Sequence, residues 1–409
     1  MRYLLVFLQS VLFVTAAQAE FQWSDNSVWN RAKIITPQQH SWSFRTTYQN
    51  FDTRFSNDGS TRSLGSQLDR TWTWGQLINA EKSQDAKNFL RNYIKGKYRE
   101  EDIAASTVFD LKREETTMEI AWAYGLAQRW MVGFMLPISL VKAELTPETR
   151  LTPQLRAALG DSTVMSRTDS DARKKVSELV DNQLTSQGYD SFRNDTQNLI
   201  VGEVSLLNQF GLVQSPDWAV SLQQLVRIPS APNYSVNDFV KNSRGDGQVD
   251  LGLTLMADHP WRKFLFGAKA GYVYHVPDTQ KMHVPKEDGS TEIVDRSVKR
   301  KLGDMFTGSL ESFYKLSRRV NANMGYMGFF KGADHYAGDF DQAAYWELSN
   351  DSAQELHLMR AGLSYLIGRP NLRGGVEQKW IANANYYQPV SGRNISDGGT
   401  AALELQTYF

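Results

Sequence analysis

The last ten residues, TAALELQTYF (400–409), decide the fold. Apolar and polar side chains alternate there as in a strand with two unlike faces, with Leu403, Leu405 and Phe409 on one face and Glu404, Gln406 and Tyr408 on the other. A strand at the end of a chain normally leaves one edge of backbone donors and acceptors unpaired, and such edges favour aggregation. We therefore expect another part of the chain to close this edge.

The first residues predict export. A basic Arg2, an apolar run from Leu4 to Val14 and an Ala-Gln-Ala site at 17–19 are typical of a cleaved secretory signal peptide at 1–19. The alternative, an uncleaved anchor, has an apolar core shorter than the roughly 20 residues of a spanning helix. The chain has no Cys, so we expect an exported protein without disulfides.

Composition narrows the class of protein. Lys and Arg together number 45 and so do Asp and Glu, and this balance argues against a nucleic-acid partner. After the signal, no stretch approaches the roughly 18 consecutive apolar residues of a transmembrane helix. Aromatic residues nevertheless make up 12% of the chain. A polar chain with many aromatic residues suits a lipid-facing barrel, in which only alternate residues touch lipid.

Alternation with a period of two recurs along most of the mature chain and predicts paired strands. Eight of them are 198–212 with 217–229, 246–257 with 261–276, 304–316 with 319–332, and 353–367 with 372–388. The C-terminal strand, a pair around Gly125 and an opening strand at 41–55 bring the total to about twelve. A further pair, 68–78 with 102–112, would make fourteen. The predicted fold is an all-β transmembrane antiparallel β-barrel.

The connections between these strands alternate in length. Short ones lie near 125–129, 213–217, 258–260, 317–319 and 368–371, and long ones near 144–197, 230–245, 277–303, 333–352 and 389–398. Membrane barrels have short periplasmic turns and longer outer loops, whereas a soluble β-sandwich has no reason to keep this order. Charged segments at 79–98 and 171–184 predict solvated outer-loop helices. A lid or partner-binding surface is the alternative for loops 56–102 and 144–197.

Aromatic residues gather next to the short turns. They are Tyr124, Trp130, Phe210, Trp218, Trp261, Tyr314 and Tyr365. Barrels in membranes carry aromatic girdles at the lipid interfaces, so these residues predict the periplasmic ring. The alternative is that they are core aromatics of a sandwich.

These patterns answer the question of the free edge, because a closed barrel pairs its last strand with its first, here 41–55. The chain at this point resembles bacterial outer-membrane proteins, whose terminal strand ending in Phe is read by the barrel insertion machinery. The matching residues are Leu403, Leu405, Thr407 and Phe409. The resemblance implies a monomeric barrel in the lipid of a Gram-negative outer membrane.

Three segments carry a more specific resemblance: YGLAQRWMVGFMLPI (124–138), GDGQVDLGLTL (245–255) and YYQPVSGRN (386–394). They are similar to the outer-membrane family associated with meta-pathway phenol degradation, which is related to the fatty-acid and toluene transporter channels. The resemblance implies passage of small, apolar or aromatic molecules. The Asn-Pro-Ala plug motif of the fatty-acid channels is absent near the mature N-terminus.

Charged residues lie opposite the apolar stripes of their strands and therefore predict the lumen lining, because charges facing lipid are penalised by about 2–4 kcal/mol at the bilayer midplane. They are Glu203, Arg227, Asp250, Lys269, Glu311, Lys315, Arg360, Glu377, Lys379 and Glu404. The mixed signs argue against strong ion selectivity. The alternative is that paired charges simply fill the interior. The segment 20–40, before a barrel at 41–409, could enter the lumen as a partial plug or extend into the periplasm.

Two other functions remain as alternatives. Catalysis would need a nucleophile or activated water beside a base, and of six His residues only His335, near Asp334, Asp339 and Asp341, suggests a constellation, which could equally hold a cation. His275 and His283 flank an outer loop. We expect no enzyme activity, no cofactor and no metal. A surface binding or adhesion barrel acting through its long loops is the second alternative.

Overall fold

A computed structural model describes residues 28–80, 84–160, 195–230, 247–285, 293–338, 349, 352–367 and 379–409. The predicted signal peptide therefore lies outside the described residues. Strands dominate, and the largest sheet contains fourteen of them. They are β1 (His40–Phe51), β4 (Arg70–Thr73), β5 (Ile103–Ala127), β6 (Trp130–Leu151), β7 (Asp195–Val201), β8 (Val204–Gln214), β9 (Ala219–Ile228), β10 (Asp250–Trp261), β11 (Phe264–His275), β14 (Met305–Lys315), β15 (Val320–Lys331), β17 (Gln354–Ile367), β18 (Lys379–Arg393) and β20 (Thr400–Tyr408).

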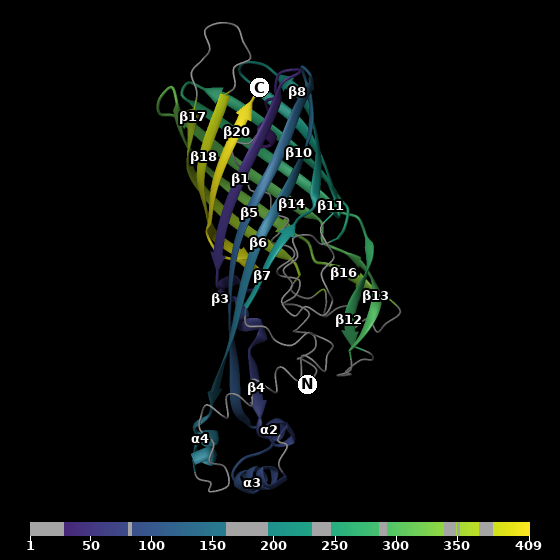
Figure 1. Ribbon diagram of the computed structural model, residues 1–409, viewed down its shortest axis with the longest axis vertical. Coiled ribbons are helices and arrows are strands. Elements are labelled where there is room, and N and C mark those ends of the chain that lie inside the picture. Colours follow the sequence, from purple (N-terminus) through teal and green to yellow (C-terminus); the bar gives the residue numbers. More distant parts are fainter. Residues whose placement is uncertain are drawn as a thin grey trace.

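Twelve of these strands form a closed antiparallel ring (Figure 1), because β5 pairs with β6 as well as with β1, while β4 and β7 lie outside the ring on β5 and β6. The last strand pairs with the first, with Ser41 opposite Tyr408. Backbone bonds between His40 and Phe409 in both directions complete the seam. The twelve-strand barrel and its closure by the C-terminal strand are confirmed. The fourteen-strand alternative is wrong, because 102–112 is the first half of the continuous 25-residue β5.

The barrel is apolar outside and polar inside. Every strand of the ring exposes a large apolar side chain on its outer face, for example Phe44, Met118, Leu140, Leu206, Val226, Leu253, Phe266, Leu310, Met324, Leu363, Tyr386 and Leu403. Buried polar side chains line the interior, among them Glu115, Gln209, Gln223, Asn383 and Glu404. This reversal of the usual soluble arrangement is typical of a barrel that faces lipid. In the described part of the chain, no helix combines the length and apolar character needed to cross a membrane.

Short turns lie at one end of the barrel, the turn end, and long connections at the other, the loop end. The described short turns join β5 to β6, β8 to β9, β10 to β11 and β14 to β15. The predicted turn at 368–371 lies outside the described residues, as does the predicted start of β18 at 372–378. The turn end is therefore the periplasmic end of the barrel and the loop end is the outer end, as predicted.

Several predicted loops contain strands, because hairpin pairing continues beyond the ring. β12 (Asp278–Pro285), β13 (Ile293–Lys301) and β16 (His335–Ala337) form one small sheet, and β2 (Thr53–Phe55), β3 (Thr61–Ser63) and β19 (Ile395–Ser396) form another. β18 likewise runs through much of the predicted loop 389–398. The predicted turn at 258–260 is wrong, since β10 continues to Trp261.

β5 and β6 extend far past the barrel at the loop end. At about 3.3 Å per residue β5 spans roughly 80 Å, while a membrane strand needs only about 9–11 residues. While η3 (Leu64–Leu68) lies against β5 nearer the barrel, the tip of β5 carries β4, α2 (Trp74–Ala80), α3 (Gln84–Ile94) and α4 (Pro153–Gly160), as Figure 1 shows. We call this group the outer module. Its own core includes Trp74, Ile78, Leu90 and Leu155.

The predicted helix at 79–98 is instead covered by two helices of the outer module, α2 and α3. The predicted loop 144–197 starts with the end of β6 and then α4. The predicted helix at 171–184 lies outside the described residues.

The predicted strand 198–212 is split in two. β7 and β8 follow one another along β6, with a break opposite Pro137. Pro137 has no N–H to donate, and its carbonyl instead accepts a bond from Gly202 N at 2.8 Å. The break shifts the alternation by one residue, so that Leu199 and Leu206 both face outward. Unbroken alternation along the predicted strand 198–212 would place Ile200 and Leu206 on one face, and this is wrong, since Ile200 is buried.

Candidate functional site: the barrel lumen

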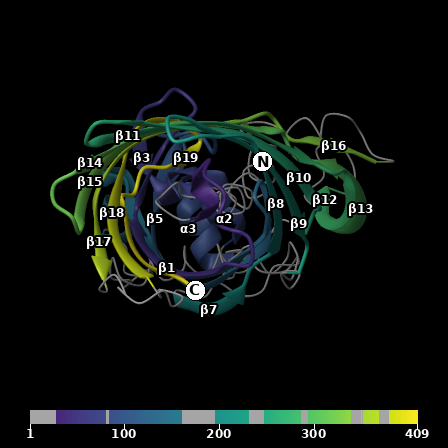
Figure 2. The ribbon, with the colours of Figure 1, turned by 90° about the horizontal axis from the view of Figure 1, so that it is seen from above.

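Residues 28–39 lie inside the barrel at its turn end. Viewed along the axis, the purple start of the described chain lies within the ring of strands (Figure 2). It opens with η2 (Val28–Asn30), whose Trp29 is only 3% exposed. The cluster around Trp29 consists of Ile34, Ile35, Ala121, Ala123, Met131, Met135, Leu207 and Leu225. Apart from the two isoleucines, these are wall residues, so the segment packs into the lumen as a core element.

Wall glutamines hold the backbone of this lumenal segment. Gln223 Nε2 donates to Trp29 O at 3.0 Å, Gln209 Nε2 to Arg31 O at 2.8 Å, and Gln214 Nε2 to Ala32 O at 3.0 Å. A buried irregular segment has no ladder to pair its carbonyls, so side chains must do so. The three bonds come from β8 and β9 and fix the segment against one side of the wall.

An ion pair fastens the same segment to β10. Arg31 Nη2 lies 3.0 Å from Asp258 Oδ1, and the two side chains are 14% and 8% exposed. The second carboxylate oxygen, Oδ2, accepts from Ala32 N at 2.9 Å. The guanidinium also lies over the Phe313 ring, 4.7 Å from its centroid. Asp258 therefore bonds both the side chain and the backbone of the segment.

A cavity lies directly beside the segment, with Trp29 and Asn30 forming part of its lining. It opens to solvent at its mouth, and its empty volume is about 800 Å³ when this open space is included. The other lining residues are Gln223, Leu225, Arg227, Gly252, Thr254, Met256, Lys269, Val273, Met305, Thr307, Gly308, Ser309, Met327, Gly328 and Phe329. The cavity thus combines an apolar surface with polar side chains on β9, β10, β11 and β14.

Two apolar clusters meet at this cavity. Leu225 belongs to the cluster around Trp29 at the turn end. Met305, Met327 and Phe329 belong to a second cluster towards the loop end, together with Phe55, Leu356, Leu358, Tyr387, Ile395 and Ala402. An apolar surface therefore continues from the loop end of the lumen to the lumenal segment.

Charged side chains share one carboxylate at mid-barrel. Lys269 Nζ lies 3.2 Å from Glu311 Oε1, and Arg360 Nη2 lies 3.4 Å from Glu311 Oε2. The Glu311 and Arg360 side chains are each 1% exposed. This trio links β11, β14 and β17, so it braces three strands across the wall.

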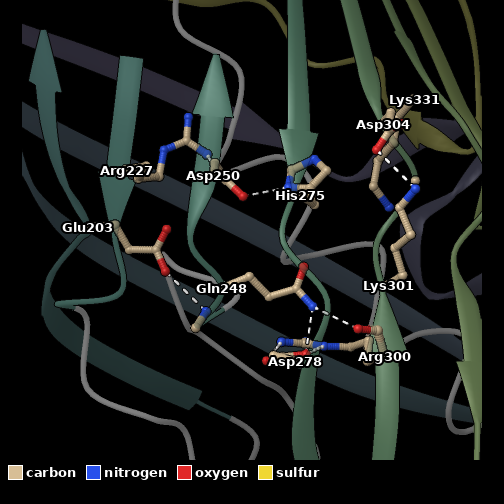
Figure 3. A network of polar contacts seen from close by, with 12 residues as sticks. Glu203, Arg227, Gln248, Asp250, His275, Asp278, Arg300, Lys301, Asp304 and Lys331 are labelled. Carbon is tan, nitrogen blue, oxygen red and sulfur yellow. Dashed lines mark hydrogen bonds and ion pairs between the residues drawn. The ribbon is translucent and has the colours of Figure 1, made fainter. Parts of the chain in front are cut away.

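A second polar network lies nearer the loop end (Figure 3). Arg227 Nη1 lies 2.6 Å from Asp250 Oδ2, and His275 Nδ1 lies 2.6 Å from Asp250 Oδ1. Below them in the figure, Gln248 Nε2 and Arg300 both donate to Asp278. The network joins β9, β10 and β11 to the β12–β13 sheet.

Seven of the ten residues predicted to line the lumen are largely buried on the inner face, namely Glu203, Arg227, Asp250, Lys269, Glu311, Arg360 and Glu404. The structure brings Arg227 to Asp250, and Lys269 to Glu311 and Arg360. Glu404 accepts from Ser43 and Asn383. Lys315 is exposed at the turn end, Lys379 is placed only as the first residue of β18, and Glu377 lies outside the described residues.

Sequence reasoning missed Arg31, Asp258 and the three glutamines. Asp258 lies on the same face of β10 as Asp250, so the alternation that identified Asp250 carried the signal for it. Arg31 precedes the first strand, where no alternation could place it.

The predicted girdle residues face outward near the turn end. Trp130, Phe210, Trp218, Trp261 and Tyr365 are between 44% and 50% exposed, whereas Tyr124 and Tyr314 are half-buried. Trp218 stacks on His259, and Tyr314 contacts Phe264. Of the predicted assembly signal, Leu403, Leu405 and Phe409 are exposed outside, while Thr407 is buried between its cross-strand neighbours Trp42 and Trp380.

The predicted His constellations lie only partly within the described residues. Asp334 accepts from Gly303 N and pairs with Lys331, and His335 lies in β16, while Asp339 and Asp341 lie outside the described residues. His283 lies in β12, and His275 bonds Asp250 within the lumen. The described residues contain no group of three or more His, Asp or Glu able to hold a metal ion.

No family model and no curated protein matches this sequence. Solved structures do match. An outer membrane channel from Pseudomonas putida F1 is 10% identical, with a TM-score of 0.52 over 94% of this chain and 99% of that chain. A Pseudomonas aeruginosa FadL homologue (9% identity, TM-score 0.34, 98% of this chain and 95% of that chain) and the Ralstonia pickettii toluene transporter TbuX (9%, 0.35, 94% and 92%) are geometrically more distant. The predicted resemblance to outer-membrane channel barrels is confirmed at the level of the fold.

Proposed function

We propose that this protein is an outer-membrane channel that admits small molecules into the barrel lumen. The observation that carries the proposal is the cavity inside the barrel, with Trp29 and Asn30 of the lumenal segment in its lining. The cavity is lined by residues of five wall strands, so a small molecule inside the barrel would contact the wall directly.

The expected substrates are apolar or aromatic. Much of the cavity surface comes from Leu225, Met305, Met327 and Phe329. The solved structures with similar folds include a channel described as a monoaromatic hydrocarbon channel and a toluene transporter, which agrees with this chemistry. The apolar outer belt supports a location in outer-membrane lipid, and in this proposal the C-terminal strand is the segment that the insertion machinery reads.

The lumenal segment acts as a partial plug in this proposal. It blocks the turn end by packing against Met131 and Met135, and it is fastened by Asp258 and the wall glutamines. Wall side chains hold the backbone at Trp29, Arg31 and Ala32, whereas backbone bonds to the wall lie at Gln38 and Gln39, which bond Gly125 next to the start of β1. Displacement of residues 28–37 would therefore open the path towards the periplasm without breaking a strand pair of the barrel.

The test is the ionic conductance of the refolded mature protein in planar bilayers, compared with a variant lacking residues 28–38. We expect rare or small current steps from the full-length protein and frequent, larger steps from the deletion variant. Insertion of both proteins is verified by protection of the barrel from protease. Silence of the deletion variant, with insertion verified, would reject a channel through this lumen.

A second function, surface binding, is favoured by the outer module. Its core of Trp72, Trp74, Ile78 and Leu90 lies beyond the barrel, where a channel alone requires no folded unit. Removal of the module, by shortening both the connection from β1 to β5 and the connection from β6 to β7, should leave conductance unchanged if the module serves binding. Loss of conductance would instead make the module part of the channel entrance.

A further inference from the structure

The charged part of the cavity lining has one sign. Of the residues that line the cavity, Arg227 and Lys269 are the ionisable ones, and both are cationic. Their carboxylate partners Asp250 and Glu311 bond them from outside that lining. A molecule in the cavity therefore meets cationic side chains and the apolar surface of Met305, Met327 and Phe329 together.

Lys269 belongs to a buried ion cluster in which Glu311 bonds both Lys269 and Arg360. A buried cation is stabilised by an opposite charge beside it. The cavity, which Lys269 lines, is the space in which a bound anion would lie next to its ammonium.

The flexible methionine side chains of the cavity indicate the chemistry of the uncharged part of the ligand. Methionine side chains are unbranched and polarisable, so they adapt to flat or irregular apolar molecules. Met256, Met305 and Met327 line the cavity together with Phe329 and Trp29. The cavity therefore offers one molecule both an apolar surface for an aromatic ring and the Lys269 ammonium.

We propose that the cavity selects small amphipathic anions, an aromatic or apolar body with one acidic group, through the Lys269 ammonium and the Arg227 guanidinium. This inference rests on the proposed function, because it names the substrate class of the same lumen. Lys269 interacts directly with the acidic group, and Glu311 and Arg360 position it.

The test compares two probes of similar size, benzoate and benzyl alcohol, by titration calorimetry with the full-length protein in detergent. We expect benzoate to bind at least tenfold more tightly than benzyl alcohol. Lys269→Met should reduce benzoate affinity about tenfold without changing that for benzyl alcohol, whereas Lys269→Arg should retain the preference. Removal of Lys269 leaves Glu311 paired with Arg360, so the barrel should still fold. Lys315→Met, at an exposed lysine on β14, is the matched control and should bind as the unchanged protein does.

Two results would overturn the inference: equal affinity for both probes, or a preference for benzoate that survives Lys269→Met. Neither result depends on ion flow. A protein that conducts but shows no preference would retain the proposed function and lose this substrate class. A protein that shows the preference but never conducts would retain the binding site and lose the channel.

Discussion

The Arg31–Asp258 pair makes a sharp prediction about opening. Asp258→Asn removes the charge that faces Arg31 while keeping an oxygen that can accept from Ala32 N. Breaking a buried pair by removing one partner costs about 3–5 kcal/mol. The Arg31 guanidinium keeps its contact with the Phe313 ring, which offsets about 2 kcal/mol of this loss. The lumenal segment should therefore be held less tightly by about 1–3 kcal/mol.

At about 1.4 kcal/mol per factor of ten, this weakening raises the open-to-closed ratio about 5- to 150-fold. The assay is the open fraction of single channels in planar bilayers. Asp217→Asn, the same change at an exposed turn-end position, is the control and should leave the open fraction unaltered. The double variant Arg31→Met with Asp258→Asn should open less than the sum of the single effects predicts, because both changes remove one interaction. An open fraction unchanged by Asp258→Asn, or strict additivity in the double variant, would refute the reasoning.

Three further predictions concern the wall, the outer module and a loop. Leu255→Lys, on the lipid-facing side of β10, should reduce the free energy of folding into liposomes by about 2–4 kcal/mol. Thr254→Lys, in the cavity lining, should reduce it much less. Equal losses would contradict the assignment of the two faces. Trp74→Ala should lower the free energy of unfolding of the outer module by about 3–5 kcal/mol. Amide exchange should become faster in α2 and α3 but not in the ring strands. Faster exchange throughout the barrel would show that the module does not fold separately. Hydrogen bonds from Ser56 and Ser60 hold the pKa of the Asp58 carboxyl below its ordinary value of 3.8. The contribution of Asp58 to loop order is therefore present above pH 3.8 and is lost as the pH falls through the lower pKa of the folded state. The Ser60 amide, which donates to Asp58, should exchange faster in acid, and Asp58→Asn should remove this pH dependence.

Local alternation predicted the barrel because each strand pairs with its sequence neighbour, so face and order follow from the chain itself. The closure of β20 on β1 followed from the need to pair a terminal edge. β5 was harder to predict, because nothing local distinguishes a strand that leaves the membrane from two separate strands. The shift at Gly202 depends on Pro137, some 65 residues earlier, which only pairing brings opposite.

The site was less accessible to sequence reasoning than the wall. Alternation identified Arg227, Asp250, Lys269, Glu311 and Arg360 as inward-facing, but their contacts depend on register between strands. The lumenal segment has no periodicity, and its place was left open between lumen and periplasm. Its contacts with Asp258 and Gln223 arise from closure of the whole barrel.

The most direct test of the account uses the natural absence of cysteine from the chain. Single variants Asn30→Cys and Ala32→Cys are displayed on intact cells and treated with a small, membrane-impermeant thiol reagent. Asn30 lines the cavity and is partly exposed, whereas Ala32 is fully buried against the wall. The account predicts modification of Asn30→Cys from outside and much slower modification of Ala32→Cys. If neither cysteine reacted on intact cells while both reacted after lysis, the segment would lie in the periplasm and the account would be contradicted.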